Sequence, residues 1–302
     1  MEIPEQLKFS CGDKVGIVAC SNPLSPTQRQ DVELLCEVLR HFSLVPVCSG
    51  SVLATPGERP ARRRAEDLMR LYRDPDIKAV FDVSGGDLAN ELLPYLAFDV
   101  IRKNPKPFFG YSDLTTIINA LYQCAGQSCV LYQVRNLVGE AGTMQQKMFR
   151  SALTGKGTAL CQVTWNFLQG SKMEGTLIGG NLRCFLKLAG TPYFPETEGR
   201  LLFLESLGGG PEQITTYICQ LRQIGVFSRI AGLLLGTFTT LEKQIGIDSA
   251  ISLIRTVADC PDLPMAKTQQ VGHALDSRAL VIGSRYACSR AVSVVSANGC
   301  SG

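Results

Sequence analysis

Short apolar runs alternate with amphipathic segments along the first half of this 302-residue chain. Runs of strand length occupy residues 15–20, 44–48 and 77–83, whereas residues 27–41 and 61–72 carry apolar side chains at helical spacing. Strands that are apolar throughout are typical of parallel sheets, because helices cover both faces of such a sheet. The sequence therefore predicts an α/β fold built on a parallel sheet with helices on both sides.

The segment Lys106–Thr116 reads as a short buried strand that breaks sharply into a helix, with a serine at the break. Gly110 allows the backbone to turn closely, and apolar residues then recur at helical spacing. A serine at such a junction projects its hydroxyl above the sheet, and the first amides of the helix can hold an oxyanion. Ser112 is therefore a candidate nucleophile. The alternative is that Ser112 only caps the helix, with Asp113 complementing the helix dipole.

A pair of glycines follows the third predicted strand, in the string Ser84-Gly85-Gly86-Asp87. Ligands of parallel sheets bind beyond the carboxyl ends of the strands, and both this string and Ser112 fall there. Gly85 and Gly86 let the backbone approach a substrate, so they are a second place to look for an oxyanion donor. The alternative is an ordinary turn. The string is neither Gly-x-Gly-x-x-Gly nor a Walker loop, so it carries no prediction of nucleotide binding.

The pattern changes in the second half of the chain. The alternation is lost between about residues 139 and 174, and the glycine-containing stretch 154–158 indicates a domain boundary. The length allows two ordinary domains. We therefore predict an N-terminal domain over residues 1–160 and a C-terminal domain over residues 161–302. Strand-length apolar runs mixed with helical segments return at residues 176–182, 201–206 and 230–236.

A nucleophilic serine needs a base, and the chain has two histidines. His41 ends an amphipathic segment, which favours a structural role, whereas His273 lies in a loop after a strand-like segment. The imidazole in turn needs an acid that holds its tautomer and stabilises the imidazolium. Glu205 ends an apolar strand and is the best placed acid, although it could instead cap the following glycine turn. The residues alone therefore support a hypothesis of Ser112, His273 and Glu205 as a catalytic set.

These strings resemble peptidase family S66, which comprises the LD-carboxypeptidases and the microcin C immunity peptidases. The resemblance extends over nearly the whole chain and rests on four motifs in the family's order. They are Gly-Tyr-Ser-Asp-Leu-Thr at 110–115, Gly-Gly-Asn-Leu at 179–182, the glutamate Glu205 after an apolar strand, and Gly272-His273 followed by Leu-Val-Ile-Gly at 280–283.

The resemblance implies a Ser-His-Glu hydrolase, a serine-type carboxypeptidase that uses no cofactor and no metal. It implies a Rossmann-like N-terminal domain, of the flavodoxin or class I amidotransferase type, that carries Ser112. A swivelling β/β/α C-terminal domain would carry Glu205 and His273, with the active site in the cleft between the domains. By analogy the backbone amides of Gly86 and Asp113 would form the oxyanion hole. A homodimer is also implied.

The substrate is less constrained, because the chain departs from the family near the site. Ser84 stands where many LD-carboxypeptidases have arginine, and the usual Tyr-Gly-Pro appears as Tyr-Gln-Val at 132–134. The leading prediction is an LD-carboxypeptidase acting on murein tetrapeptides. One alternative is a microcin C immunity-type hydrolase of peptidyl or aminoacyl nucleotides. Another is a non-catalytic protein that binds wall peptides, against which the retained Ser, Glu and His argue.

Four residues are candidates for substrate binding: Gly85, Asp87, Asn181 and Trp165. Trp165 is the only tryptophan of the chain and lies between the predicted domains. It could stack on a nucleotide base, or it could belong to the hydrophobic core. The peptide alternative needs no such aromatic surface.

Composition excludes several other functions. The net charge is +3, and the basic run at residues 59–64 is followed by Glu66 and Asp67, as on a solvated helix face, so we expect no nucleic-acid partner. The twelve cysteines are scattered singly in apolar strings, which favours buried residues in a reducing compartment over disulfides or a zinc site. No apolar run is long enough for a membrane span and no leader pattern opens the sequence, so we expect a cytoplasmic protein.

Overall fold

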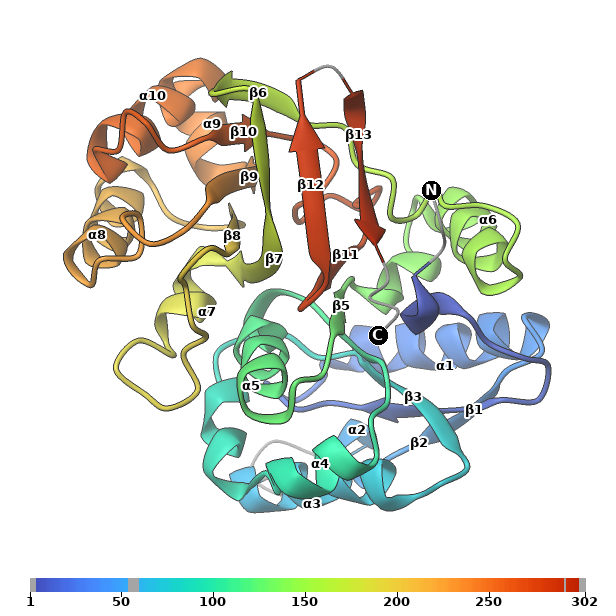
Figure 1. Cartoon of the computed structure of the whole chain (residues 1–302). Helices are drawn as coiled ribbons and strands as arrows, with labels where there is room; N and C mark the ends of the chain where they lie inside the picture. The colour runs from blue at the N-terminus through green and yellow to red at the C-terminus, as the bar shows by residue number, and fades with distance from the viewer. Residues whose placement is uncertain (1–3, 54–59, 291, 299–302) are drawn as a thin grey trace.

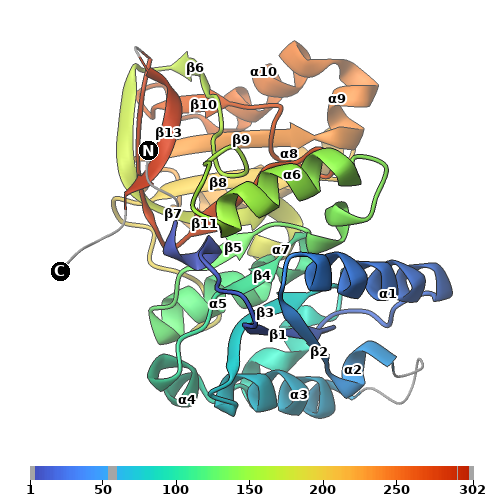
Figure 2. The ribbon, with the colours of Figure 1, turned by 90° about the vertical axis from the view of Figure 1, so that its right-hand side faces the viewer.

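The computed structural model describes residues 4–53, 60–290 and 292–298, and it contains two sheets stacked one above the other (Figures 1 and 2). The first sheet has the strand order β11-β5-β4-β3-β1-β2 and the second has the order β13-β12-β7-β8-β9-β10-β6. Helices lie against both sheets. The α/β class predicted from the sequence is confirmed.

The strands of the first sheet run parallel except for β11, which pairs antiparallel with β5. Alternate side chains enter two different cores, as Phe108 and Phe109 of β4 illustrate: Phe108 joins the core on one face and Phe109 the core on the other. Both faces are therefore buried, which explains the continuous apolar runs. The strands are β1 (Lys14–Val18), β2 (Val45–Cys48), β3 (Ile77–Asp82), β4 (Phe108–Gly110), β5 (Cys129–Leu131) and β11 (Leu280–Ile282).

Helices cover the two faces of this sheet in two groups. On one face lie α1 (Pro26–His41) and α6 (Gly142–Leu153), and on the other lie α3 (Ala61–Arg73), α4 (Phe98–Lys103) and α5 (Thr115–Ala125). The α1 helix begins with a capping box, in which the Ser25 hydroxyl accepts from the Gln28 amide and the Gln28 side chain accepts from the Ser25 amide. Shorter helical segments are η1 (Glu5–Leu7), α2 (Gly50–Leu53), η2 (Ala89–Tyr95), η3 (Ser112–Leu114) and η4 (Val134–Leu137).

The second sheet has a parallel centre, β7-β8-β9-β10, flanked by antiparallel strands. Its helices α7 (Leu182–Leu186), α8 (Pro211–Gln223), α9 (Thr239–Ile245) and α10 (Ile247–Ala258) pack on one face around a separate apolar core. The strands are β6 (Asn166–Gln169), β7 (Lys172–Asn181), β8 (Leu201–Ser206), β9 (Gly232–Phe238), β10 (Met265–Lys267), β12 (Arg285–Ser289) and β13 (Val292–Asn298).

A common core joins the two sheets. The cluster that contains Ile117 and Leu121 of α5 also contains Leu177 of β7 and Phe203 of β8. In addition, β11 returns from the C-terminal half to the edge of the first sheet. We therefore propose that the chain divides at about residue 160, with β11 crossing back. The two halves share apolar surface, so their relative position is set by packing.

The α6 helix lies where the sequence pattern is lost. The alternation fails over residues 139–174, yet α6 forms there and buries Phe149, Ala152 and Leu153. The helix also buries the polar side chain of Gln145, which interrupts the apolar stripe on which the prediction depends.

The sequence predicts that the basic run at residues 59–64 is solvated, but the structure buries one of its arginines. Arg64 is 2% exposed, and its guanidinium donates to the Cys20 carbonyl oxygen at 2.6 Å and pairs with Glu91 at 2.5 Å. Backbone carbonyl groups of the loop after β1 therefore bind the Arg64 guanidinium, which the helical pattern predicts to be exposed to solvent. Arg59 lies outside the described residues.

The burial that the sequence favours for the cysteines does not hold for all of those within the described residues. Cys11 and Cys48 are exposed, because Cys11 lies in the turn before β1 and Cys48 ends the edge strand β2. Cys300 lies outside the described residues. No helix in the described part of the chain is both long and apolar enough to cross a membrane.

Candidate active site

Ser112 stands at the sharp turn between β4 and α5, in the short helical segment η3. Its backbone φ is 56°, in the left-handed region that residues other than glycine rarely adopt. Such strain persists only where the surrounding structure enforces it, and it is common at functional sites. The residue that precedes α5 is Leu114, and the Ser112 hydroxyl contacts His273 instead of capping the helix. The capping alternative is therefore wrong.

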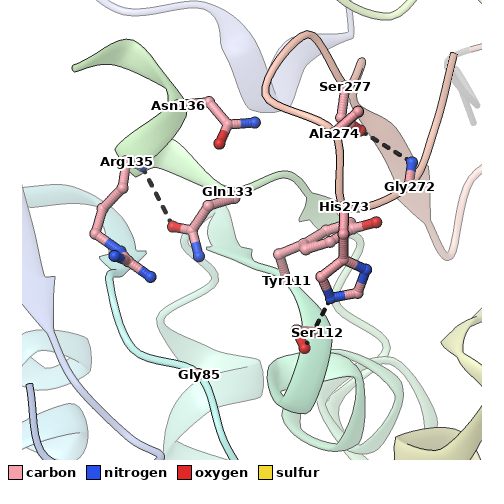
Figure 3. A pocket seen from close by; sticks show the side chains of 10 residues that line it. All are labelled: Gly85, Tyr111, Ser112, Gln133, Arg135, Asn136, Gly272, His273, Ala274 and Ser277. Atoms are coloured by element: carbon pink, nitrogen blue, oxygen red, sulfur yellow. Dashed lines mark hydrogen bonds between the residues drawn. The ribbon is translucent and has the colours of Figure 1, made fainter. Parts of the chain in front are cut away.

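Ser112, His273 and Glu205 lie in one line of hydrogen bonds. The His273 Nε2 atom is 3.1 Å from Ser112 Oγ, and its Nδ1 atom is 2.7 Å from Glu205 Oε2. Because an ionised carboxylate only accepts hydrogen bonds, it favours the tautomer with the proton on Nδ1. Nε2 is then free to accept the Ser112 proton. Residues 161 positions apart in the chain thus meet at one point (Figure 3).

Glu205 is fully buried at the end of β8 and has a second partner. Asn181, at the end of the neighbouring strand β7, donates from Nδ2 to Glu205 Oε1 at 3.1 Å. Asn181 is 4% exposed, and its Oδ1 accepts from the Cys184 amide at the start of α7. The sequence predicts Asn181 as a substrate-binding residue. The structure gives its side chain two protein partners, one of which is the carboxylate behind His273.

Tyr111 packs beside the same histidine. Its ring meets the His273 ring edge to face, with 4.9 Å between the centroids. Burial raises the pKa of the Tyr111 hydroxyl well above its ordinary value, and the neighbouring Glu205 charge raises it further. The hydroxyl therefore stays protonated beside the carboxylate, and the ring limits where the imidazole can move.

The helix α5, which follows the turn that carries Ser112, is hydrogen-bonded directly to β7 of the second sheet. Asn119 of α5 donates to the Gly179 carbonyl oxygen and accepts from the Gly179 amide, each at 2.9 Å. The Asn181 amide donates to Thr115 Oγ1 at 3.0 Å. Gly180, with φ of 138°, permits this approach, because a Cβ there would lie 2.5 Å from Thr115 Oγ1. These contacts set the distance between the nucleophile and the acid.

The loop that carries His273 is held by α6, the helix missed in the sequence. Gln145 is fully buried and donates to the carbonyl oxygens of Leu275 and Ser277, each at 2.9 Å. The Tyr132 hydroxyl donates to Gln145 Oε1 at 2.9 Å. Sequence reasoning had no signal for Gln145, because its contacts lie about 130 residues away along the chain.

Asp113 has an entirely internal environment. It is fully buried, and its carboxylate accepts from the Ser21 hydroxyl at 2.6 Å, the Ala89 amide at 2.8 Å and Lys187 Nζ at 2.6 Å. Lys187 follows α7, so this contact also joins the two halves of the chain. The backbone amide of Asp113 remains the predicted oxyanion donor. Among the described residues, no hydrogen bond uses that amide or the Gly86 amide as donor.

The glycine pair approaches Asn22 closely. A Cβ at Gly86, where φ is 127°, would lie 2.2 Å from the Asn22 side chain. Gly85 lines the pocket described below, whereas Asp87 is half exposed and bonded to Arg183. This contact lowers the pKa of the Asp87 carboxyl below its ordinary value. Asp87, a predicted substrate-binding residue, does not line that pocket.

Trp165 does not reach the site. It is 4% exposed and packs edge to face on Phe203 in the core that joins the two sheets. Trp165 is not among the residues that line the pocket beside Ser112, which favours the core alternative over substrate binding.

A pocket of about 200 Å³ opens beside Ser112. Its walls come from both halves of the chain: Gly85, Ser112 and Gln133 from the first, and Gly272, His273 and Ser277 from the second (Figure 3). The described residues contain no group of three or more His, Cys, Asp or Glu side chains placed for a metal ion. The arrangement is suited to nucleophilic attack at a carbonyl group.

Two family models match the chain. The LD-carboxypeptidase N-terminal domain of peptidase family S66 matches residues 15–133, and the LD-carboxypeptidase C-terminal domain matches residues 174–287. The chain belongs to peptidase family S66. The family resemblance noted in the sequence is thereby confirmed, and a carboxypeptidase family is the coarse functional assignment.

Individual relatives agree with this assignment. The "Probable murein peptide carboxypeptidase" of Bacillus subtilis (strain 168) is 29% identical over 297 residues, which cover 93% of this chain and 90% of the relative. A solved structure of the microcin C7 self-immunity protein MccF in complex with aspartyl sulfamoyl adenosine has a TM-score of 0.86 at 22% identity, covering 97% of each chain. The muramoyltetrapeptide carboxypeptidase from Oxalobacter formigenes has a TM-score of 0.76 at 21% identity, covering 93% of this chain and 97% of that chain. The structural likeness shows a shared fold.

Proposed function

We propose that this protein is a serine carboxypeptidase of the S66 type in which Ser112 is the nucleophile, His273 the general base and Glu205 the acid that holds the base. The observation that supports it is the continuous line of hydrogen bonds from Glu205 through His273 to Ser112. The strained backbone at Ser112 gives independent support.

The reaction follows from these positions. His273 Nε2 takes the proton of Ser112 as Oγ attacks the amide carbonyl carbon, and the amides of Gly86 and Asp113 stabilise the oxyanion. His273 then gives that proton to the leaving amine as the carbon–nitrogen bond breaks, which leaves an ester on Ser112. Water, deprotonated by His273, hydrolyses the ester and restores the serine. Glu205 stabilises the imidazolium in both steps without taking its proton.

For the substrate we propose an L,D-amide next to a free carboxylate, as in a murein tetrapeptide that loses its terminal D-alanine. The name of the Bacillus subtilis relative supports this choice. The nucleotide alternative is less well supported, because Trp165 is buried and offers no surface for a base. A pure binding protein would have no need of the hydrogen-bonded Ser112, His273 and Glu205.

The test is mass spectrometry of an L-Ala-D-Glu-meso-diaminopimelyl-D-Ala tetrapeptide incubated with the wild type and with Ser112→Ala. We expect D-alanine release by the wild type alone. A fluorophosphonate should label the wild type and the control Ser249→Ala, an exposed position in α10, but not Ser112→Ala. Equal labelling of the wild type and Ser112→Ala overturns the nucleophile assignment. Labelling without release, together with hydrolysis of an aminoacyl adenylate, overturns the murein substrate and supports the nucleotide alternative.

A further inference from the structure

Three polar side chains form one wall of the pocket. Gln133, Arg135 and Asn136 come from the carboxyl end of β5 and the segment η4 that follows it. Figure 3 shows them grouped across the pocket from Ser112 and His273. The mechanism proposed above uses none of them. A wall of this kind beside a nucleophile is placed to recognise a polar group of the substrate.

Arg135 is the charged member of this wall, and its bonding is incomplete. Its side chain is 19% exposed, and its Nη1 atom lies 3.6 Å from Asp31 Oδ2, which is long for a hydrogen bond. The buried Nε atom has no hydrogen-bond partner among the described residues. The charges of Asp31 and Asp82 act on this group, but the ion pair with Asp31 engages a single nitrogen of a guanidinium that carries five N–H donors. Burial of a cation without full pairing is costly, which favours a role in binding an anion.

The two amides add uncharged donors. The Gln133 oxygen accepts from the Arg135 backbone amide at 3.3 Å, which turns the NH₂ group of Gln133 toward the pocket (Figure 3). Asn136 is 8% exposed, and its side-chain amide also faces the pocket. The wall therefore offers a guanidinium together with neutral N–H groups, a combination suited to a carboxylate.

We propose that Arg135, with Gln133 and Asn136, binds the free α-carboxylate of the residue that leaves the substrate. This inference rests on the proposed function and deepens it, because it explains why the enzyme would cleave the last amide bond of a peptide and not an internal one. A carboxylate that pairs with Arg135 places the preceding amide over the pocket beside Ser112. A peptide that continues beyond this residue has no charge there and leaves the guanidinium unpaired.

The test measures binding apart from catalysis. Isothermal titration calorimetry compares the tetrapeptide acid with its C-terminal carboxamide, both on Ser112→Ala. We expect the acid to bind about 10- to 100-fold more tightly, as for a charge-assisted bidentate contact. Adding Arg135→Gln should reduce this ratio to near one. Adding Arg135→Lys, which keeps the charge but loses the planar fork, should give an intermediate ratio. Arg73→Gln, an exposed arginine at the end of α3, is the matched control and should keep the full ratio.

Each outcome decides the proposal. A preference for the acid that survives Arg135→Gln, equal binding of the two peptides to Ser112→Ala, or binding of neither peptide overturns it. A fall in affinity for both peptides alike shows that Arg135 only holds η4 or meets another carboxylate, which also overturns it. The failure of the proposed function looks different. In that case the wild type releases no D-alanine, while the Arg135-dependent preference in binding can still be present.

Discussion

Asp113 and Arg135 follow neighbouring strands of the same sheet, β4 and β5, yet their charges are treated in opposite ways. The Asp113 carboxylate is fully buried and accepts three hydrogen bonds, one of them from Lys187 in the other half of the chain. The Arg135 guanidinium lies 3.6 Å from the Asp31 carboxylate and also feels the charge of Asp82, but its buried Nε atom has no partner among the described residues. The Asp113 charge is paired within the protein, whereas we propose that the Arg135 charge pairs with the substrate.

This difference separates two kinds of residue around one pocket. Residues with a full set of partners, such as Asp113 and Asn181, fix the geometry of the groups beside them. Residues with spare donors face the pocket, as Arg135 and Gln133 do. The carboxyl ends of β4 and β5 thus carry both a residue of the rigid frame, Asp113, and the side chains that we propose for recognition, Gln133 and Arg135. Four substitutions test this division, beginning with the largest effect.

Removing the base should abolish the reaction. For His273→Ala we expect kcat for D-alanine release to fall by at least about 10,000-fold, because neither Ser112 nor the leaving amine has another proton carrier. His41→Ala is the matched control: His41 is exposed at the end of α1, where its ring bonds the Glu37 carbonyl, and activity should change less than about twofold. Steady-state kinetics of both variants make the comparison. A His273→Ala protein with near-normal kcat would contradict the assignment of the base.

Removing the negative charge of Asp113, whose carboxylate accepts three hydrogen bonds, should lower the stability of the protein. For Asp113→Asn we expect the free energy of unfolding to fall by roughly 3 kcal/mol, because Lys187 loses its buried counter-charge. Urea unfolding measures the change. The double variant Asp113→Asn/Lys187→Met should recover part of the loss, since no unpaired charge remains. Strictly additive losses would show that the two side chains are not coupled.

Asn181→Ala distinguishes positioning from binding. If Asn181 orients Glu205, kcat should fall about 10-fold with little change in KM, as for the loss of one hydrogen bond to a charged group. If it binds substrate, as the sequence alone predicts, KM should rise while kcat is kept. The kinetic parameters of this one variant therefore decide between the two roles.

The smallest effect is expected at Asp87, the exposed counterpart of Asp113. The Arg183 contact lowers its pKa in the folded state, so the stabilisation is present above the ordinary aspartate pKa of about 3.9 and is lost as pH falls below it. Because the side chain is 58% exposed, we expect Asp87→Asn to cost only about 0.2 to 0.5 kcal/mol at pH 7. Urea unfolding of the wild type and the variant at pH 7 and pH 3 should show a smaller difference at the lower pH. A difference that grows at pH 3 would reverse the sign of the argument.

Secondary structure is predicted correctly where it depends on the residues of one segment alone. The strands β1, β3 and β8 are apolar because both faces of their sheets are covered. The turn at Ser112 is predicted by Gly110 and by the apolar residues at helical spacing that follow it. Prediction is weaker where the role of a side chain depends on a distant partner. The sequence predicts that Trp165 and Asn181 bind substrate, whereas in the structure Trp165 packs on Phe203 and Asn181 is hydrogen-bonded to Glu205. The α6 helix was missed because its buried Gln145 serves a loop far along the chain.

The sequence by itself determined the α/β class, the family, and which serine, histidine and glutamate to consider together, because these depend on periodicity and on ordered motifs. The meeting of Ser112 with His273 was decided only by the tertiary structure, through the contacts that Asn119, Asn181 and Gln145 make between segments. The incomplete pairing of the Arg135 guanidinium is likewise visible only in the tertiary structure, because the partners of a charge depend on all the residues packed around it. Hydrogen bonding and desolvation depend on which groups are close in space, and a short stretch of sequence does not show which distant residues will lie beside it.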